Sequence, residues 1–322
     1  MKKILAFGLI LLVALSCLCA CGKAPAPEDP AAPTAQDGKL NVVCSIFPPY
    51  DFIRMIAVDR IDLTLLLDSK TDLHSYSPTA DDIMKISNAD LFVNIGGESD
   101  DWAEDVIASA ANKDLKVVSL INLCNAVEEE TLPGMQEEEE PGEADGPEYD
   151  EHVWTSLKNV IQIVPSLTDT LCELDEANAA FYRANCNDYL ANLQALEAEY
   201  AAAIGSAARK TLLFADRFPF RYLADDYGLT CFAAFSGCSA ETEASFETIT
   251  MLVDTVKAQK LPFVLMIEGS DGSVADTVSR QSGAEIRVLN SCQSVSADDI
   301  AKGTTYLSIM NDNLEVLKEV LN

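Results

Sequence analysis

At residues 72–82 the sequence reads Asp-Leu-His-Ser-Tyr-Ser-Pro-Thr-Ala-Asp-Asp, and the rest of the chain is organised around this stretch. It contains His74, one of only 2 histidines in 322 residues. The other, His152, lies in a second acidic stretch, Asp150-Glu-His-Val-Trp154. A lone histidine is more often a surface or hydrogen-bonded core residue. Two of them in matching acidic surroundings indicate a metal site, because neutral imidazole is the commonest metal ligand and a nearby carboxylate can fix its tautomer.

Both histidines lie just ahead of a predicted helix start. Ser77 is predicted to cap the first of these helices, with Pro78 in its first position. Thr155 or Ser156 is predicted to cap the second, which begins at Leu157. A side chain in such a position lies at the rim of an element, where binding sites are usually built.

The first half of the chain alternates predicted strands and helices. The strands are expected at 41–46, 61–67, 91–95 and 116–120, and the helices at 50–58, after Ser77 and at 102–111. Such alternation is typical of a parallel sheet covered by helices, whose ligands bind beyond the carboxyl ends of the strands. His74 follows the second of these strands and is therefore expected at that edge.

A long and nearly glycine-free segment, 177–208, precedes a second alternation. Its apolar residues recur at helical spacing, which predicts one long helix with a packing face. Beyond it, strands are expected at 212–214, 232–235, 263–267 and 286–289, and helices at 221–227, 245–260, 274–282 and 306–321. The sequence therefore predicts an α/β protein with two βα lobes.

Residues 1–20 have the pattern of a secretory signal peptide, with two lysines before an apolar run and small residues after it. Residues 18–22, Leu-Cys-Ala-Cys-Gly, resemble a bacterial lipoprotein box in which Cys21 becomes the lipidated first residue, with Cys17 as the competing site. The apolar run is close to the lower limit of roughly 17 residues for a membrane span, and a cleaved signal fits it better. Residues 21–39 are then a flexible tether, and the mature chain is extracytoplasmic, anchored to the cell membrane by lipid.

The charge of the chain is strongly negative, with a formal net charge of -30 and a pI of about 4.2. This argues against nucleic-acid binding, which requires clustered Lys and Arg. The most acidic segment, 128–151, has no Lys or Arg and is predicted to be a disordered loop. It either collects cations beside the site or is a solvated loop with no role.

Several motifs resemble those of the zinc- and manganese-binding solute-binding proteins of ABC importers. The histidine motifs are His74-Ser-Tyr-Ser-Pro78 followed by Asp81-Asp-Ile83, and His152-Val-Trp154; the others are Ser45–Phe52, Ala89–Gly96, Tyr222–Leu229 and Tyr306–Leu314. The resemblance runs from residue 40 to 322 and is interrupted by the acidic segment. It implies a metal cleft between two lobes that one long backbone helix joins.

The resemblance also implies a division of the chain and a function. The N-terminal metal-binding lobe would span 40–174, the linking helix 175–209 and the C-terminal lobe 210–322. The protein would be a monomer, not an enzyme. It would capture Zn²⁺, or alternatively Mn²⁺, and deliver it to an ABC permease and its ATPase.

The second half of the expected ligand set departs from the family pattern. The family usually supplies a third ligand, His or Glu, five residues before the tyrosine that matches Tyr222, and this register falls on Arg217, which cannot bind a cation. The register of a fourth ligand, often Asp, falls on Asn290. Asp216 or Glu268 could supply charge instead, with Arg217 turned away to pair with a carboxylate. Glu268, and Asp271 three residues further on, are equally well explained as solvated carboxylates or as salt-bridge partners of Arg217 or Arg221. The candidate metal ligands are therefore His74, His152, Asp216, Glu268 and Asn290.

Seven cysteines follow Cys21, without the C-x-x-C spacing of a zinc site. The pairs Cys172–Cys186 and Cys231–Cys238 are closest in sequence, but spacing does not fix disulfide connectivity. Cys292 lies near Asn290 and could also offer a thiolate.

Two other functions compete with transport. A surface adhesin is compatible with the lipid anchor and the acidic surface. A metallohydrolase needs an open coordination position and a general base, and the sequence has no H-E-x-x-H or G-x-S-x-G motif and no P-loop.

Overall fold

The computed structural model describes residues 38–68, 73–136, 149–239 and 243–322. The predicted signal peptide, the predicted lipidation site Cys21 and the predicted tether up to residue 37 lie outside these ranges. No helix within the described ranges is both long and apolar enough to cross a membrane.

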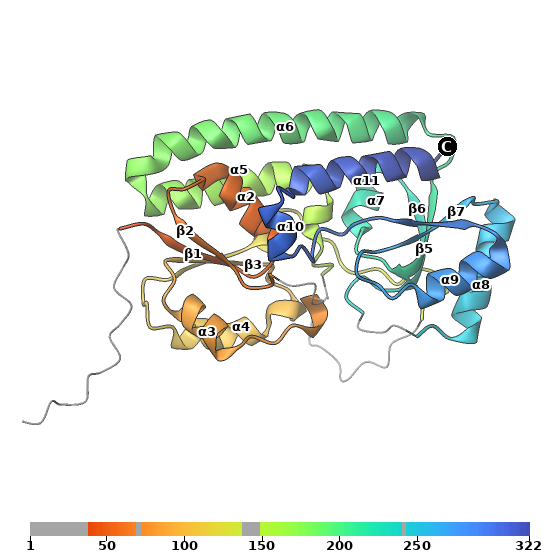
Figure 1. The fold of residues 1–322 in the computed structure, drawn as a ribbon, viewed down its shortest axis with the longest axis horizontal. Coiled ribbons are helices and arrows are strands. Elements are labelled where there is room, and N and C mark those ends of the chain that lie inside the picture. Colours follow the sequence, from red (N-terminus) through yellow and green to blue (C-terminus); the bar gives the residue numbers. More distant parts are fainter. Residues whose placement is uncertain (1–37, 69–72, 137–148, 240–242) are drawn as a thin grey trace, which may run out of the picture. The chain divides into compact units, whose positions relative to one another are not determined.

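The first lobe is built on a four-stranded parallel sheet with the strand order β2-β1-β3-β4. Its strands are β1 (Asn41–Cys44), β2 (Asp62–Leu65), β3 (Leu91–Asn94) and β4 (Lys116–Ser119), and its helices are α2 (Phe47–Ala57), α3 (Ala80–Ser87), α4 (Trp102–Ser109) and α5 (Leu157–Leu174). Helices α3 and α4 cover one face of the sheet, and α2 and α5 cover the other (Figure 1). The central strands β1 and β3 are apolar along most of their length because both of their faces are buried.

The second lobe repeats this plan with the strand order β6-β5-β7-β8. Its strands are β5 (Thr211–Arg217), β6 (Thr230–Phe235), β7 (Phe263–Met266) and β8 (Glu285–Val288), and its helices are α7 (Arg221–Tyr227), α8 (Phe246–Gln259) and α9 (Ser273–Ser282). The chain then returns to the first lobe at α10 (Ala297–Ala301), where the Ala297 N–H donates to the carbonyl of Asp68 at 2.9 Å, and ends with α11 (Tyr306–Val320). Helices α8 and α9 pack together and bury a separate apolar cluster against this sheet. The predicted two-lobed α/β fold with parallel sheets is confirmed.

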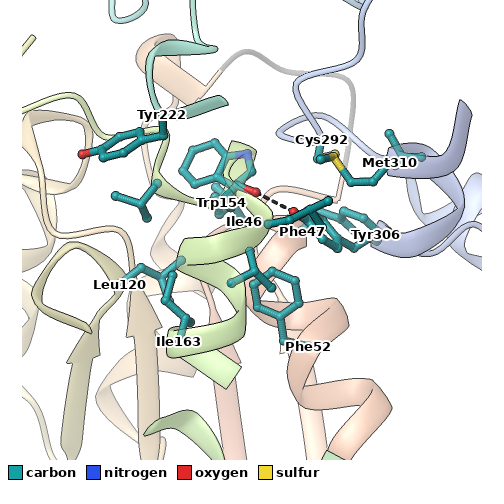
Figure 2. Close-up of a cluster of buried hydrophobic side chains, with 14 of the residues drawn as sticks. Ile46, Phe47, Phe52, Leu120, Trp154, Ile163, Tyr222, Cys292, Tyr306 and Met310 are labelled. Atoms are coloured by element: carbon teal, nitrogen blue, oxygen red, sulfur yellow. Dashed lines mark hydrogen bonds between the residues drawn. The ribbon is translucent and has the colours of Figure 1, made fainter. Parts of the chain in front are cut away.

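The predicted long helix is α6 (Ala179–Ser206), which packs against α5, α2 and α11 (Figure 1). One continuous apolar core contains side chains from both lobes. Within it, the Tyr306 hydroxyl donates to the carbonyl of Trp154 at 2.7 Å (Figure 2). Trp154 Nε1 donates to the carbonyl of Ser291 at 2.7 Å. The segment that follows His152 is therefore fixed to the second lobe. Cys292 lies in this apolar cluster, near Met310 (Figure 2).

The predicted helix caps were right for α5 and wrong for α3. The Ser156 side chain accepts from the backbone of Asn159 and caps α5. At α3 the cap is Thr79 rather than Ser77: Thr79 Oγ1 accepts from the Asp82 N–H at 3.2 Å, and the Asp82 carboxylate accepts from the Thr79 N–H at 3.0 Å. This capping box needs an acidic partner three residues after the cap, and only Thr79 has one.

The prediction of a disordered loop over 128–151 was wrong at both ends of the segment. Glu128 and Tyr149 form an antiparallel bridge. Met135 is buried, and the Gln136 N–H donates to the carbonyl of Ala234 at 2.8 Å. Apolar side chains among the acidic ones thus dock the segment on the second lobe, while residues 137–148 lie outside the described ranges.

We expect Thr79→Ala to lower the free energy of unfolding by about 1 kcal/mol, because it removes the hydroxyl that accepts from the Asp82 N–H and donates to the Asp82 carboxylate. Ser77→Ala is the matched control, since Ser77 is exposed and outside the helix, and it should change stability by less than about 0.5 kcal/mol. Chemical denaturation of both variants measures the difference. Equal losses would show that the box does not hold α3.

Candidate metal centre

His152 is fixed by the carboxylate two positions before it. Its backbone N–H and its ring Nδ1–H both donate to Asp150 Oδ1, at 2.8 and 3.1 Å. The two side chains are 0% and 2% exposed. Because a carboxylate only accepts, Nδ1 carries the proton and the lone pair of Nε2 remains available. Asp150 thus orients His152 as carboxylates orient imidazole ligands in metal sites.

His74 lies on a 3-10 turn, Leu73–Ser75, between β2 and α3. Its Nδ1 is 2.8 Å from the hydroxyl oxygen of Ser99, and its Nε2 is 3.4 Å from Nε2 of His152. Two nitrogens bound to one tetrahedral zinc ion, each about 2.0–2.1 Å from it, are about 3.3–3.4 Å apart. The two imidazoles are therefore spaced as two ligands of one ion.

Acidic groups surround this pair of imidazoles. Burial opposes protonation of His152, but Asp150 and more distant carboxylates, those of Glu151 and Glu129, raise its pKa above the ordinary value. Burial also raises the pKa of Glu151 and of Glu129. A field that favours an imidazolium over a neutral ring also favours a divalent cation at the same place.

A further group of candidate ligands includes His74. Among the described His, Cys, Asp and Glu side chains, one group of three has ligand atoms within 4.8 Å of one another: His74, Glu151 and Cys238. Glu151 is 1% exposed; its Oε1 accepts from the Ser99 N–H at 2.8 Å, and its Oε2 has no hydrogen-bond partner in the described part of the chain. Cys238 lies just beyond the carboxyl end of β6, so this group joins the two lobes.

The backbone next to Cys238 approaches His152 closely. A Cβ placed on Gly237 would lie 3.0 Å from the carbonyl oxygen of Phe218 and 3.1 Å from Cε1 of His152. Both contacts are tighter than ordinary van der Waals packing. Glycine at this position therefore allows the loop to reach the imidazole.

Two polar contacts hold the same loop. Arg217 Nη1 donates to the carbonyl of Ser239 at 3.2 Å, and the Cys238 N–H donates to Glu129 Oε1 at 3.2 Å. Arg217 occupies the register in which the family usually has its third ligand, and here it binds loop backbone. Glu129 comes from the acidic segment, which thus helps to position the second lobe.

The three second-lobe residues predicted as ligands all make hydrogen bonds to protein. Asp216 accepts from two backbone N–H groups, one in its own strand at 2.8 Å and one at the end of β7 at 3.1 Å. Glu268 accepts from the N–H and the hydroxyl of Ser291 at 2.7 and 2.6 Å, and Asn290 Oδ1 accepts from the N–H of Cys292 at 2.8 Å. None of the three belongs to the group of neighbouring ligand atoms described above, and their role as ligands stays a prediction.

Sequence analysis missed Glu151 and Cys238 as site residues. Glu151 directly precedes His152, and Cys238 follows β6 at the edge where ligands of parallel sheets bind. The position of Cys238 just after a predicted strand could therefore have indicated it as a site residue. All seven described cysteines are free thiols, so Cys238 is not used in a disulfide bond.

Two parallel-sheet α/β lobes with a converging pair of imidazoles, one after β2 and one just ahead of α5, are the arrangement of a metal-binding solute-binding protein. The chain belongs to the family described as zinc-uptake complex component A periplasmic (ZnuA), whose pattern matches residues 42–320.

Similar proteins come from several bacteria. The zinc-binding lipoprotein AdcA of Streptococcus pneumoniae serotype 4 is 31% identical over 287 residues, which cover 88% of this chain and 56% of that protein. The high-affinity zinc uptake system protein ZnuA of Bacillus subtilis is 30% identical over 318 residues, 98% of this chain and 97% of that protein. The crystal structure of the Zn(II)-bound ZnuA-like domain of S. pneumoniae AdcA has a TM-score of 0.73 at 29% identity and covers 88% of this chain and 99% of that domain. The chain thus spans little more than half of AdcA.

We expect Gly237→Ala to weaken zinc binding by about tenfold or more, because the added methyl group must displace His152 or the loop. Gly205→Ala in α6 is the control: nothing lies within 4 Å of a Cβ there, so affinity should not change and stability should rise by up to about 1 kcal/mol. Competition titration against a zinc-sensitive dye measures both. An unchanged zinc affinity in Gly237→Ala would show that the loop around Gly237 does not contact His152 when zinc is bound.

Proposed function

We propose that this chain is an extracytoplasmic solute-binding lipoprotein that captures Zn²⁺ and delivers it to an ABC permease and its ATPase. The observation that carries this proposal is the pair of Nε2 atoms of His74 and His152, 3.4 Å apart. The outer nitrogens of both rings are already engaged, by Ser99 and Asp150. The two Nε2 atoms face each other at a spacing that suits two ligands of a shared ion.

Zinc is the preferred cargo, and manganese is the alternative. Imidazole suits zinc, whereas manganese prefers carboxylate, carbonyl and water oxygens, and the general affinity order also places Zn²⁺ above Mn²⁺. The names of the relatives from S. pneumoniae and B. subtilis refer to zinc. Asp216, Glu268 and Asn290 would contribute by fixing the strand ends of the second lobe, through the hydrogen bonds they make there.

The membrane association would come from lipid on Cys21, followed by a flexible tether and a monomeric binding domain. The related AdcA of S. pneumoniae is itself named a lipoprotein. A tethered monomer would keep the metal cleft near the permease while leaving the domain free to dock and release.

Binding without catalysis fits the residues of the centre. A metal-assisted hydrolase needs a general base beside the ion. With His74 and His152 both used as ligands, the chain has no third imidazole for that role. We therefore propose that the ion is cargo.

We expect zinc at 1,000 times its dissociation constant to stabilise the full chain by about 4.1 kcal/mol, which should raise the melting temperature by several degrees. Manganese should produce a smaller shift. His74→Ala and His152→Ala should each abolish most of the zinc shift, because each removes one of the paired ligands. Differential scanning calorimetry with and without chelator measures this.

The melting temperature of each variant in chelator is the control, since it reports any loss of folding that is independent of zinc. An unchanged zinc shift in the double variant would place the ion elsewhere. Zinc-dependent stimulation of the permease ATPase in proteoliposomes then tests delivery.

A further inference from the structure

We propose that the Cys238 thiolate and the Glu151 carboxylate complete the metal site with His74 and His152. This inference rests on the proposed function and adds its chemistry: a closed site of two imidazoles, one carboxylate and one thiolate. The second lobe would contribute sulfur where the family usually supplies His or Glu.

The Glu151 carboxylate is buried with one of its two oxygens lacking a hydrogen bond within the described residues. It is 1% exposed, and its Oε2 makes no hydrogen bond within the described part of the chain. No ion pair joins it to any Lys or Arg among the described residues; its contacts are to Ser99 and, electrostatically, to His152 and Asp150. Burying such an oxygen costs free energy unless a hydrogen bond or a metal ion compensates for it. A cation between Glu151 and His74 would do so.

Cys238 lies close to the other candidate ligands, on a loop that is fixed by hydrogen bonds. Its ligand atom lies within 4.8 Å of those of His74 and Glu151, and the loop is anchored on both sides by Arg217 and Glu129. In a tetrahedral site with Zn–S near 2.3 Å and Zn–N near 2.1 Å, the sulfur and nitrogen ligands are about 3.6 Å apart. The present spacing, within 4.8 Å, is therefore close enough for small side-chain movements to bring the atoms to ligand distance.

The charges of this ligand set balance. A divalent ion carries two positive charges, and one carboxylate with one thiolate carries two negative charges, so the filled site is neutral and can be buried. A coordinating thiol is deprotonated by the metal. The S–H bond breaks as the S–metal bond forms, and the proton leaves to solvent.

This ligand set also predicts specificity. Thiolate is a soft ligand that favours zinc and other thiophilic ions, whereas manganese prefers oxygen. Replacing Cys238 with Ser should therefore reduce zinc affinity much more than manganese affinity.

Co²⁺ is the probe that separates this inference from the proposed function. We expect the reduced, chelator-treated full chain with one equivalent of Co²⁺ to show the visible absorption of a four-coordinate ion and a near-ultraviolet thiolate-to-cobalt band. Cys238→Ser should lose the near-ultraviolet band and keep visible absorption. Cys124→Ser is the control, since Cys124 is also partly exposed but outside the group, and it should keep both.

Visible absorption without a thiolate band in the parent chain would overturn this inference and leave the proposed function standing. No visible cobalt absorption at all would overturn both. Glu151→Gln should lower zinc affinity by about tenfold or more, whereas Glu98→Gln, an exposed neighbour, should not.

Alkylation of the unmutated chain gives a test that does not depend on how a variant folds. Zinc should slow the modification of Cys238 by iodoacetamide at least about tenfold, with the rate at Cys124 unchanged. Equal rates at Cys238 with and without saturating zinc would contradict thiolate ligation.

Discussion

The metal centre depends on the contact between the buried Asp150 carboxylate and the imidazole of His152. This contact sets the tautomer, and so it decides which nitrogen faces His74. Asp150 is itself held at both ends of its backbone, since its N–H donates to the carbonyl of Val127 at 3.0 Å and its carbonyl accepts from the Tyr222 hydroxyl at 2.7 Å. The second lobe, through Tyr222, therefore helps to orient a ligand of the first lobe.

The packing between the two lobes fixes the positions of the metal-site side chains relative to one another. Trp154, two residues after His152, donates to Ser291, and Tyr306 donates back to Trp154. These bonds lie in one apolar core that is shared by both lobes and includes side chains of α6 and α11. Because burial of apolar surface is the main stabilising term in folding, the centre is positioned by the same packing that holds the protein together. A separate core in each lobe would leave the relative position of His74 and Cys238 unfixed.

Most of the architecture could be predicted from sequence because strand and helix periodicity is local. The order of elements could be predicted for that reason, as could a helix cap at Thr155 or Ser156, which the structure places at Ser156. The predictions that were wrong or missing depend on contacts between residues far apart in sequence, or on which of two nearby residues caps a helix. Thr79 outcompetes Ser77 as a cap because Asp82 lies at the right distance from it. Cys238 and Glu151 are 87 residues apart by number, and only the folded chain brings them beside His74.

The acidic segment shows the same limit. Its composition predicts disorder, but composition does not reveal that Glu129 reaches the loop of Cys238 or that Met135 is buried. From sequence alone, Arg217 and Asn290 likewise indicate only that the usual charged or imidazole ligands of the family are missing at these two positions. In the folded chain Arg217 supports the loop that carries the candidate thiolate.

Zinc K-edge X-ray absorption of the full chain loaded with one equivalent of Zn²⁺ tests the central claim most directly. The account predicts the outer-shell scattering of two imidazoles, nitrogen and oxygen ligands at about 2.0–2.1 Å and one sulfur at about 2.3 Å. A first shell of oxygen atoms alone, with no imidazole scattering, would contradict it.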